Sequence, residues 1–222
     1  MGDVVRKLHV VPNDGGGAGR VRRANLAQIL KAAEQVFAET GFTGATMAEI
    51  ADKADLPKAN LHYYFGTKEE LYRAVLDNIL VIWQNTVSSI LPEADPAQAI
   101  ADYVRSKMEV ARTRPYASKV FANEIIRGAG LIEGFLSNDL KNQVEEKSAI
   151  LERWMAEGRM ARLDPKNLFF MIWAMTQHYA DFDAQIRLVL GKRQLSRKDF
   201  SHFTEEVVRA VLRIAGLEPP ED

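Results

Sequence analysis

The sequence predicts an all-α protein of about nine helices, because apolar residues recur at helical spacing and strand patterns are almost absent. Prolines and capping residues mark several helix starts. Asp95-Pro96 and Asp164-Pro165 each read as an N-cap followed by the first helical residue. Glycines stand where helices are expected to end. We therefore expect helices packed through apolar faces, without a sheet.

The first two predicted helices are joined by a short connection. Residues 22–40 place apolar side chains on one face, and Gly41 supplies the stop. Thr46 and Glu49 form a capping box that starts the second helix, which is expected to end near Ala54.

A tight turn separates this helix from the next. Asp55 occupies the turn, and Asp tolerates the left-handed conformation better than most residues. Pro57 is expected to be the first residue of a short helix that ends near Tyr63. Thr67 begins another capping box and a long helix over residues 68–91. Two short helices about a tight turn form the layout of a helix-turn-helix, which presents its second helix to the DNA major groove.

Five further helices are predicted in the remainder of the chain. Their limits come from prolines and capping residues at the starts and from glycines at most of the ends. The expected segments are residues 96–114, 116–127, 131–157, 165–190 and 196–215.

Length and composition limit the possible domain organisation of the chain. The 222 residues suffice for one large or two small domains, and the chain contains no cysteine. We expect a flexible tail over residues 1–20, a helix-turn-helix domain over 21–72 and an effector and dimerisation domain over 73–222. No apolar run approaches the ~20 residues of a membrane span and no signal peptide is evident, so we expect a cytoplasmic protein without membrane contact.

The sequence offers no signature of catalysis. It lacks paired carboxylates, a nucleophile elbow and a glycine-rich phosphate loop, so no catalytic residue and no cofactor are predicted. The four histidines do not have metal-ligand spacing, so no metal site is predicted either.

The N-terminal region resembles the TetR family of transcriptional regulators. The resemblance rests on residues 37–42 (FAETGF), 46–51 (TMAEIA) and 61–71 (LHYYFGTKEEL), and it spans about residues 23–75. It implies a homodimeric repressor that binds a pseudo-palindromic operator in double-stranded DNA and responds to a small-molecule effector. The net charge of −1 looks unsuited to DNA binding, but cations cluster near the predicted recognition helix.

Side chains on and around the short third helix are the candidates for DNA contact. Asn60 is the best candidate for a base edge, because its amide can pair with adenine through two hydrogen bonds. Lys68 begins the following helix, where its amide and ammonium could meet a phosphate. The full set of expected DNA contacts is Arg22, Thr46, Lys58, Ala59, Asn60, His62, Tyr63 and Lys68.

An aromatic and polar run marks the C-terminal half. Trp173, Gln177 and Asp181 recur every four residues and so share one helical face. A core helix does not need such polar groups, whereas a planar ligand needs an aromatic face and a donor–acceptor edge. The alternative, which the pattern leaves open, is that Trp173 is a core residue and Gln177 caps a neighbouring carbonyl.

Within the family, this run resembles regulators of pyrimidine utilisation, as do Trp83 with its preceding residues and residues 145–149. That resemblance implies uracil or thymine as the effector and implies ligand contacts by Trp83, Trp173 and Gln177. His178 and Tyr179 complete the candidate ligand-binding set. One alternative is the same architecture responding to a larger apolar effector, such as a drug or a fatty acyl compound. A second is an all-α enzyme that uses the aromatic site.

The last helix carries an apolar stripe, at Phe200, Phe203, Val207 and Val211. Core burial is one interpretation. We expect instead that the last two helices pair with those of a second copy to form a four-helix bundle, because the helix beginning at Pro165 is apolar on more than one face.

Overall fold

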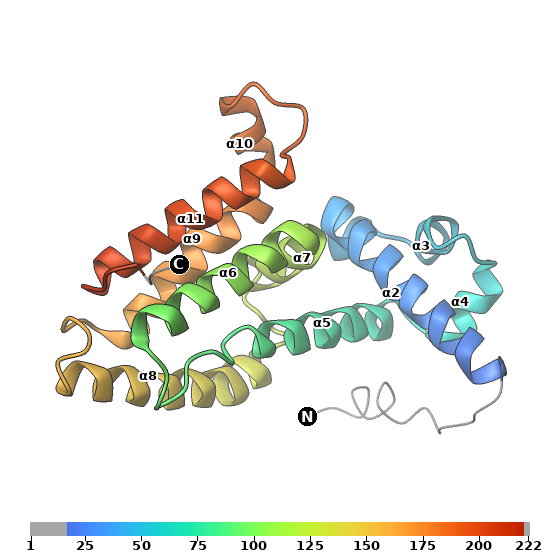
Figure 1. Ribbon diagram of the computed structural model, residues 1–222. Coiled ribbons are helices and arrows are strands. Elements are labelled where there is room, and N and C mark those ends of the chain that lie inside the picture. The colour runs from blue at the N-terminus through green and yellow to red at the C-terminus, as the bar shows by residue number, and fades with distance from the viewer. Residues whose placement is uncertain (1–16, 220–222) are drawn as a thin grey trace. The chain divides into compact units, whose positions relative to one another are not determined.

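The computed structural model describes residues 17–219, with side chains from residue 19, and confirms the all-α fold (Figure 1). Among these residues there are ten α-helices, one π-helix and no strand. The α-helices are α2 (Gly17–Gly44), α3 (Met47–Lys53), α4 (Lys58–Tyr64), α5 (Lys68–Asn85), α6 (Pro96–Thr113), α7 (Pro115–Ile126), α8 (Lys141–Ala156), α9 (Pro165–Asp181), α10 (Asp183–Val189) and α11 (Arg197–Ile214).

The π-helix η1 spans Phe135–Leu140 and leads directly into α8. Residues 1–16 of the predicted tail lie outside the described residues, whereas residues 17–20 belong to α2. None of the described helices is long and apolar enough to cross a lipid bilayer.

The chain forms two compact units. The first contains the described residues up to Ile82 together with Lys119–Glu133, and the second contains Trp83–Ser118 and the described residues from Gly134 onward. Helices α5 and α7 each contribute residues to both units.

The first unit is built on an apolar core beneath α2, α3, α4 and the first part of α5. Ile50, Leu61 and Leu71 are fully buried in it. The Phe37 ring meets Tyr72 edge-on at 4.8 Å between centroids, which adds aromatic packing to the buried area. Gly41 leaves helical geometry with φ 69°, so the predicted stop is confirmed at the residue that tolerates a positive φ.

A buried carboxylate fixes Lys119–Glu133 within the first unit. The Tyr72 hydroxyl donates to Glu124 at 3.1 Å, and the other Glu124 oxygen accepts from the Leu131 amide at 3.0 Å. Burial raises the pKa of the Tyr72 phenol, and the charge of Glu124 raises it further. The phenol therefore remains a hydrogen-bond donor to Glu124 at physiological pH.

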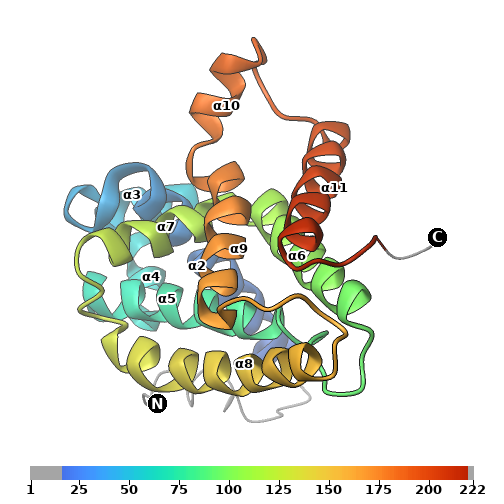
Figure 2. The same ribbon diagram turned by 90° about the vertical axis from the view of Figure 1, so that its left-hand side faces the viewer.

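The second unit is built around α6, which packs against both α9 and α11, while α8 packs against α9 (Figure 2). Trp154 on α8 is fully buried, and its indole N–H donates to the Pro92 carbonyl at 3.2 Å. This bond satisfies the polar atom of the largest buried side chain.

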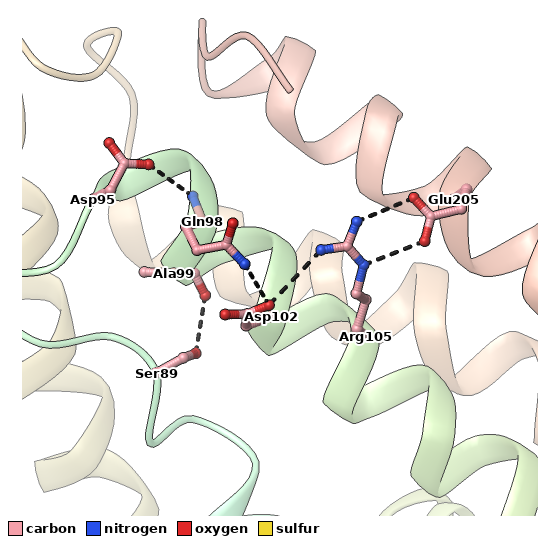
Figure 3. A network of polar contacts seen from close by, with 7 residues as sticks. All are labelled: Ser89, Asp95, Gln98, Ala99, Asp102, Arg105 and Glu205. Atoms are coloured by element: carbon pink, nitrogen blue, oxygen red, sulfur yellow. Dashed lines mark hydrogen bonds and ion pairs between the residues drawn. The ribbon is translucent and has the colours of Figure 1, made fainter. Parts of the chain in front are cut away.

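Exposed ion pairs line the contact between α6 and α11 (Figure 3). Arg105 donates two hydrogen bonds of 3.2 Å to Glu205 and also pairs with Asp102 at 3.7 Å. Nearby, the Ser89 hydroxyl donates to the Ala99 carbonyl at 2.9 Å. Such exposed pairs contribute about 0–1 kcal/mol each, so the stability of this contact comes mainly from the apolar side chains beneath them.

The helix predicted over residues 68–91 is six residues too long, because α5 ends at Asn85. At that end the Thr86 hydroxyl donates to the Trp83 carbonyl at 2.7 Å. Thr and Ser hydroxyls compete with the backbone for carbonyl acceptors in this way, and Thr86, Ser88 and Ser89 follow the end of the helix.

Two other long helices differ from the continuous α-helices that were predicted. Within the segment 131–157 the helix is unbroken, but Phe135–Leu140 form the π-helix η1 before α8. The segment 165–190 breaks at Phe182, whose φ of −115° and ψ of 29° separate α9 from α10. No Pro or Gly marks this break, so the sequence pattern does not reveal it.

Candidate functional site

The turn between α3 and α4 has the geometry of a helix-turn-helix. The Thr46 hydroxyl caps α3 by accepting from the Glu49 amide at 3.1 Å. Asp55 lies in the left-handed region at φ 49°, as its place in the turn predicted. Pro57 has an extended ψ of 138° and caps α4 instead of starting it, so this helix begins one residue later than expected.

Helix α4 buries one side and exposes the other. Leu61 is fully buried, and Phe65 just beyond the helix is buried too. The Tyr63 side chain is 74% exposed and meets the Tyr64 ring edge-on at 5.3 Å. The other predicted contact residues of this helix are also exposed, namely Lys58, Ala59, Asn60 and His62.

Lys68 has a structural role that the sequence did not indicate. Its ammonium donates to the Ala45 carbonyl at 2.8 Å and lies 4.7 Å from the centre of the Phe42 ring. These contacts tie the start of α5 to the connection between α2 and α3. An ammonium has three donors, so these contacts leave the predicted phosphate contact of Lys68 open. Arg22, by contrast, is exposed on α2.

In the second unit, α9 packs against α6, and Trp173 meets it directly. The Trp173 indole N–H donates to the Tyr103 hydroxyl at 2.7 Å. Burial raises the pKa of Tyr103, although the hydrogen bond from Trp173 opposes this shift. The phenol stays protonated and accepts from the indole at neutral pH.

A lysine lies one turn further along α6. The Lys107 side chain is 5% exposed, and its ammonium lies 5.3 Å from the centre of the Trp83 ring. Burial lowers the pKa of Lys107 to about 8, and the charge of Asp181 on α9 partly opposes the shift. The ring of Trp83 thus contacts this ammonium, and the charge of Asp181 acts on it.

Gln177 stands between these two contacts. It lies one helical turn after Trp173, which meets Tyr103, and one turn before Asp181, which acts on Lys107. Its side chain is half-buried. Of the three residues that the resemblance implied, Trp173 thus contacts Tyr103 of α6 and Trp83 contacts Lys107 of α6, while Gln177 lies on the same face of α9 as Trp173.

His178 and Tyr179 point elsewhere. His178 is exposed and stacks on Phe182, with 5.0 Å between the ring centres. Tyr179 stacks on Phe203 of α11 at 4.9 Å. Burial raises the pKa of Tyr179, as does the charge of Glu206 on α11. These two residues do not join the group around Gln177.

The predicted interface stripe on α11 is wrong in two of its members. Val207 is 5% exposed and Val211 is fully buried, and both belong to the core that α11 shares with α6 and α9. A side chain already covered within one chain offers no surface to a second copy. Phe200 and Phe203 are only partly buried and lie against the same core.

Tyr103 and Lys107 are the members of this group that sequence reasoning missed. Both lie in the apolar stripe of α6, next to Val104 and Met108. A lysine at a core position of an amphipathic helix could have indicated a functional residue, since Lys is almost never fully buried without a partner.

Two family models match adjoining parts of the chain. Residues 29–75 match the model described as bacterial regulatory proteins, tetR family. Residues 76–218 match the model described as YcdC-like protein, C-terminal region. The two matches together cover the helix-turn-helix and the whole of the second unit up to residue 218.

Individual relatives agree with these models. The chain is 41% identical over 204 residues to the HTH-type transcriptional regulator RutR of Escherichia coli K12, covering 92% of this chain and 95% of the relative. The HTH-type transcriptional repressor NicS of Pseudomonas putida is 39% identical over 77 residues, covering 34% of this chain and 36% of that one.

A solved structure supports the fold. AibR, crystallised in complex with isovaleryl coenzyme A and operator DNA, is similar with a TM-score of 0.67 and 18% identity. The similarity covers 89% of this chain and 100% of AibR.

Proposed function

Because the chain belongs to the TetR family of bacterial regulatory proteins, we propose that it is a transcriptional regulator whose effector is a pyrimidine such as uracil or thymine. It is a ligand-responsive helix-turn-helix regulator and not an enzyme.

The observation that carries the effector proposal is the face of α9 that holds Trp173 and Gln177. A pyrimidine needs an aromatic ring to stack on and an amide edge with which to pair, and this face offers both beside the buried Tyr103. The sequence resemblance to pyrimidine-utilisation regulators supports the same ligand class. The 41% identity to RutR extends through this half of the chain.

Replacing Gln177 by Leu should weaken the binding of uracil by about 10- to 100-fold. Without the amide, a polar edge of the ligand is buried without a partner, at roughly 1–3 kcal/mol. Titration calorimetry with uracil and thymine measures the loss. Gln185→Leu is the matched control, because Gln185 is an exposed residue of α10.

The same variant separates the pyrimidine from an apolar effector, for which AibR and its acyl-coenzyme A ligand offer a precedent of similar fold. An apolar effector would bind Gln177→Leu as well as the wild type or more tightly. If neither base gives a binding heat and an acyl compound raises the melting temperature, the pyrimidine proposal is contradicted. The assignment as a transcriptional regulator is not affected by that outcome.

For DNA binding, we propose that the exposed side of α4 enters the major groove, with Asn60 at a base edge and Lys58 at a phosphate. Two such helices in a symmetric dimer need to lie about 34–36 Å apart to meet successive major grooves. The backbone amide of Lys68, at the start of α5, remains a candidate phosphate donor although its ammonium is engaged.

Lys58→Ala should weaken operator binding by several-fold to about tenfold and lower the slope of log affinity against log salt by about 1, because one phosphate contact is lost. Fluorescence anisotropy on an operator selected from a random DNA pool gives both quantities. The control is Lys31→Ala, an exposed lysine in the middle of α2. An unchanged salt slope for Lys58→Ala would place the DNA-reading surface elsewhere.

We further propose that two copies pair through the outward sides of α9 and α11. Phe170 of α9 is 54% exposed and Ile214 of α11 is 42% exposed, so both helices retain apolar surface after the core is formed. Exposed aromatic and aliphatic side chains of this size on neighbouring helices are typical of a symmetric helical interface.

A further inference from the structure

The function proposed above assigns no role to Lys107, a lysine of α6 in the second unit. The side chain is 5% exposed, and the charge of Asp181 acts on its ammonium from α9. Its immediate neighbour is the ring of Trp83 at 5.3 Å. An ammonium has three donors, and a buried charge without hydrogen-bond acceptors costs stability.

The position of this ammonium matters as much as its burial. Lys107 follows Tyr103 by one turn of α6, and Tyr103 is the residue that meets Trp173. On α9, Asp181 follows Trp173 by two turns and acts electrostatically on Lys107. Gln177 lies between Trp173 and Asp181 along α9, on the face whose other two members contact or act on α6 residues.

We propose that Lys107 is a specificity-determining residue of the effector site, where its ammonium donates to a ring carbonyl oxygen that the Gln177 amide leaves unpaired. This inference rests on the proposed pyrimidine effector and narrows it to rings with two carbonyl groups. Lys107 is then a ligand contact and not merely a buried charge.

The hydrogen-bonding pattern of a pyrimidine-2,4-dione supports this assignment. One edge of that ring presents a carbonyl, an N–H and a second carbonyl in sequence. The Gln177 amide supplies one donor and one acceptor, which satisfies one carbonyl and the N–H. The second carbonyl needs another donor, and the Lys107 ammonium on α6 offers three N–H groups beside the Trp83 ring.

The Trp83 ring explains how the ammonium is kept in place before the ligand arrives. A cation over an aromatic face is attracted by the ring, and the attraction is stronger when the group is desolvated. The contact is weaker than a charged hydrogen bond, so a carbonyl oxygen at this position would compete with it successfully.

Titration calorimetry with two ligands tests the proposal. Uracil has both carbonyls, whereas pyrimidin-4-one keeps the N–H and one carbonyl and lacks the other. A charged hydrogen bond should make the wild type bind uracil about 10- to 100-fold more tightly than pyrimidin-4-one. Lys107→Met, which keeps the length and apolar bulk of the side chain, should bind the two ligands equally.

Lys166→Met serves as the matched control, because Lys166 is an exposed lysine in the first turn of α9. This variant should retain the full preference for uracil. If Lys107→Met also retains it, Lys107 is not a ligand contact, although the pyrimidine proposal stands. Equal affinity of the wild type for both ligands overturns the role of Lys107 in the same way. A wild type that binds neither ligand overturns both proposals.

Discussion

Val207→Asp is expected to unfold the protein and not merely to separate two folded copies. Val207 is 5% exposed in the core between α6, α9 and α11, so the carboxylate would be buried among apolar side chains. An unpaired buried charge costs several kcal/mol, which is a large part of the 5–15 kcal/mol that stabilises a typical domain. Circular dichroism should show loss of helix at 25 °C or a melting temperature lowered by more than about 10 °C.

Phe170→Asp is the matched comparison, because the Phe170 side chain is 54% exposed and adding a charge there leaves the core intact. This variant should stay helical and sediment as a monomer if the outward side of α9 is the interface. A helical Val207→Asp protein that sediments as a monomer would contradict the core assignment and restore the interface role predicted from the sequence.

Local signals in the sequence were sufficient for the fold and for most helix starts. Asp95, Asp164 and Ser196 all cap helices in the structure, because the side-chain oxygen of each accepts from an amide in the first turn. Asp55 adopts the left-handed conformation that its place in the turn required. These features depend on a few neighbouring residues, so a single sequence contains the information needed to find them.

Features that depend on which elements meet could not be found in this way. The apolar stripe with Val207 and Val211 fits a protomer core and a dimer interface equally well, since periodicity shows that a face is buried but not against what. The break at Phe182 has no Pro or Gly to announce it. In both cases tertiary packing decides the outcome.

In the candidate effector site too, some residues could be predicted from local sequence and others only from tertiary packing. Trp173 and Gln177 were found because their residue types are unusual together on one helical face. Tyr103 and Lys107 were missed because they lie within an apolar stripe on a different helix, and only the packing of α6 on α9 brings them to that face.

Lys107→Met is expected to stabilise the ligand-free protein by about 1–2 kcal/mol at pH 7, since it removes a buried charge. Burial lowers the pKa of Lys107 to about 8 in the folded state, although Asp181 opposes the shift, whereas an unfolded chain has the ordinary value near 10.5. Loss of the attraction to the Trp83 ring, about 2 kcal/mol for a desolvated cation, partly offsets the gain.

The pH dependence follows from these two pKa values. Below pH 8 both states hold the proton, and the folded state bears the full cost of the buried ammonium. Between pH 8 and 10.5 the unfolded chain binds more protons, so the wild type gains stability as the pH rises. Above that window neither state is charged and the cost disappears.

Urea denaturation of wild type and Lys107→Met at pH 7 and at about pH 10, at one protein concentration, measures this difference. The advantage of the variant should be largest at pH 7 and should shrink by most of its value at the higher pH. Other lysines and tyrosines titrate in both proteins alike, so the difference between the two isolates Lys107. A variant less stable than the wild type at pH 7 would mean that the folded protein stabilises this ammonium without a ligand. The expected result means that the buried charge lowers the stability of the ligand-free protein. An acceptor oxygen of the effector would remove this cost, so effector binding would favour the conformation that binds it.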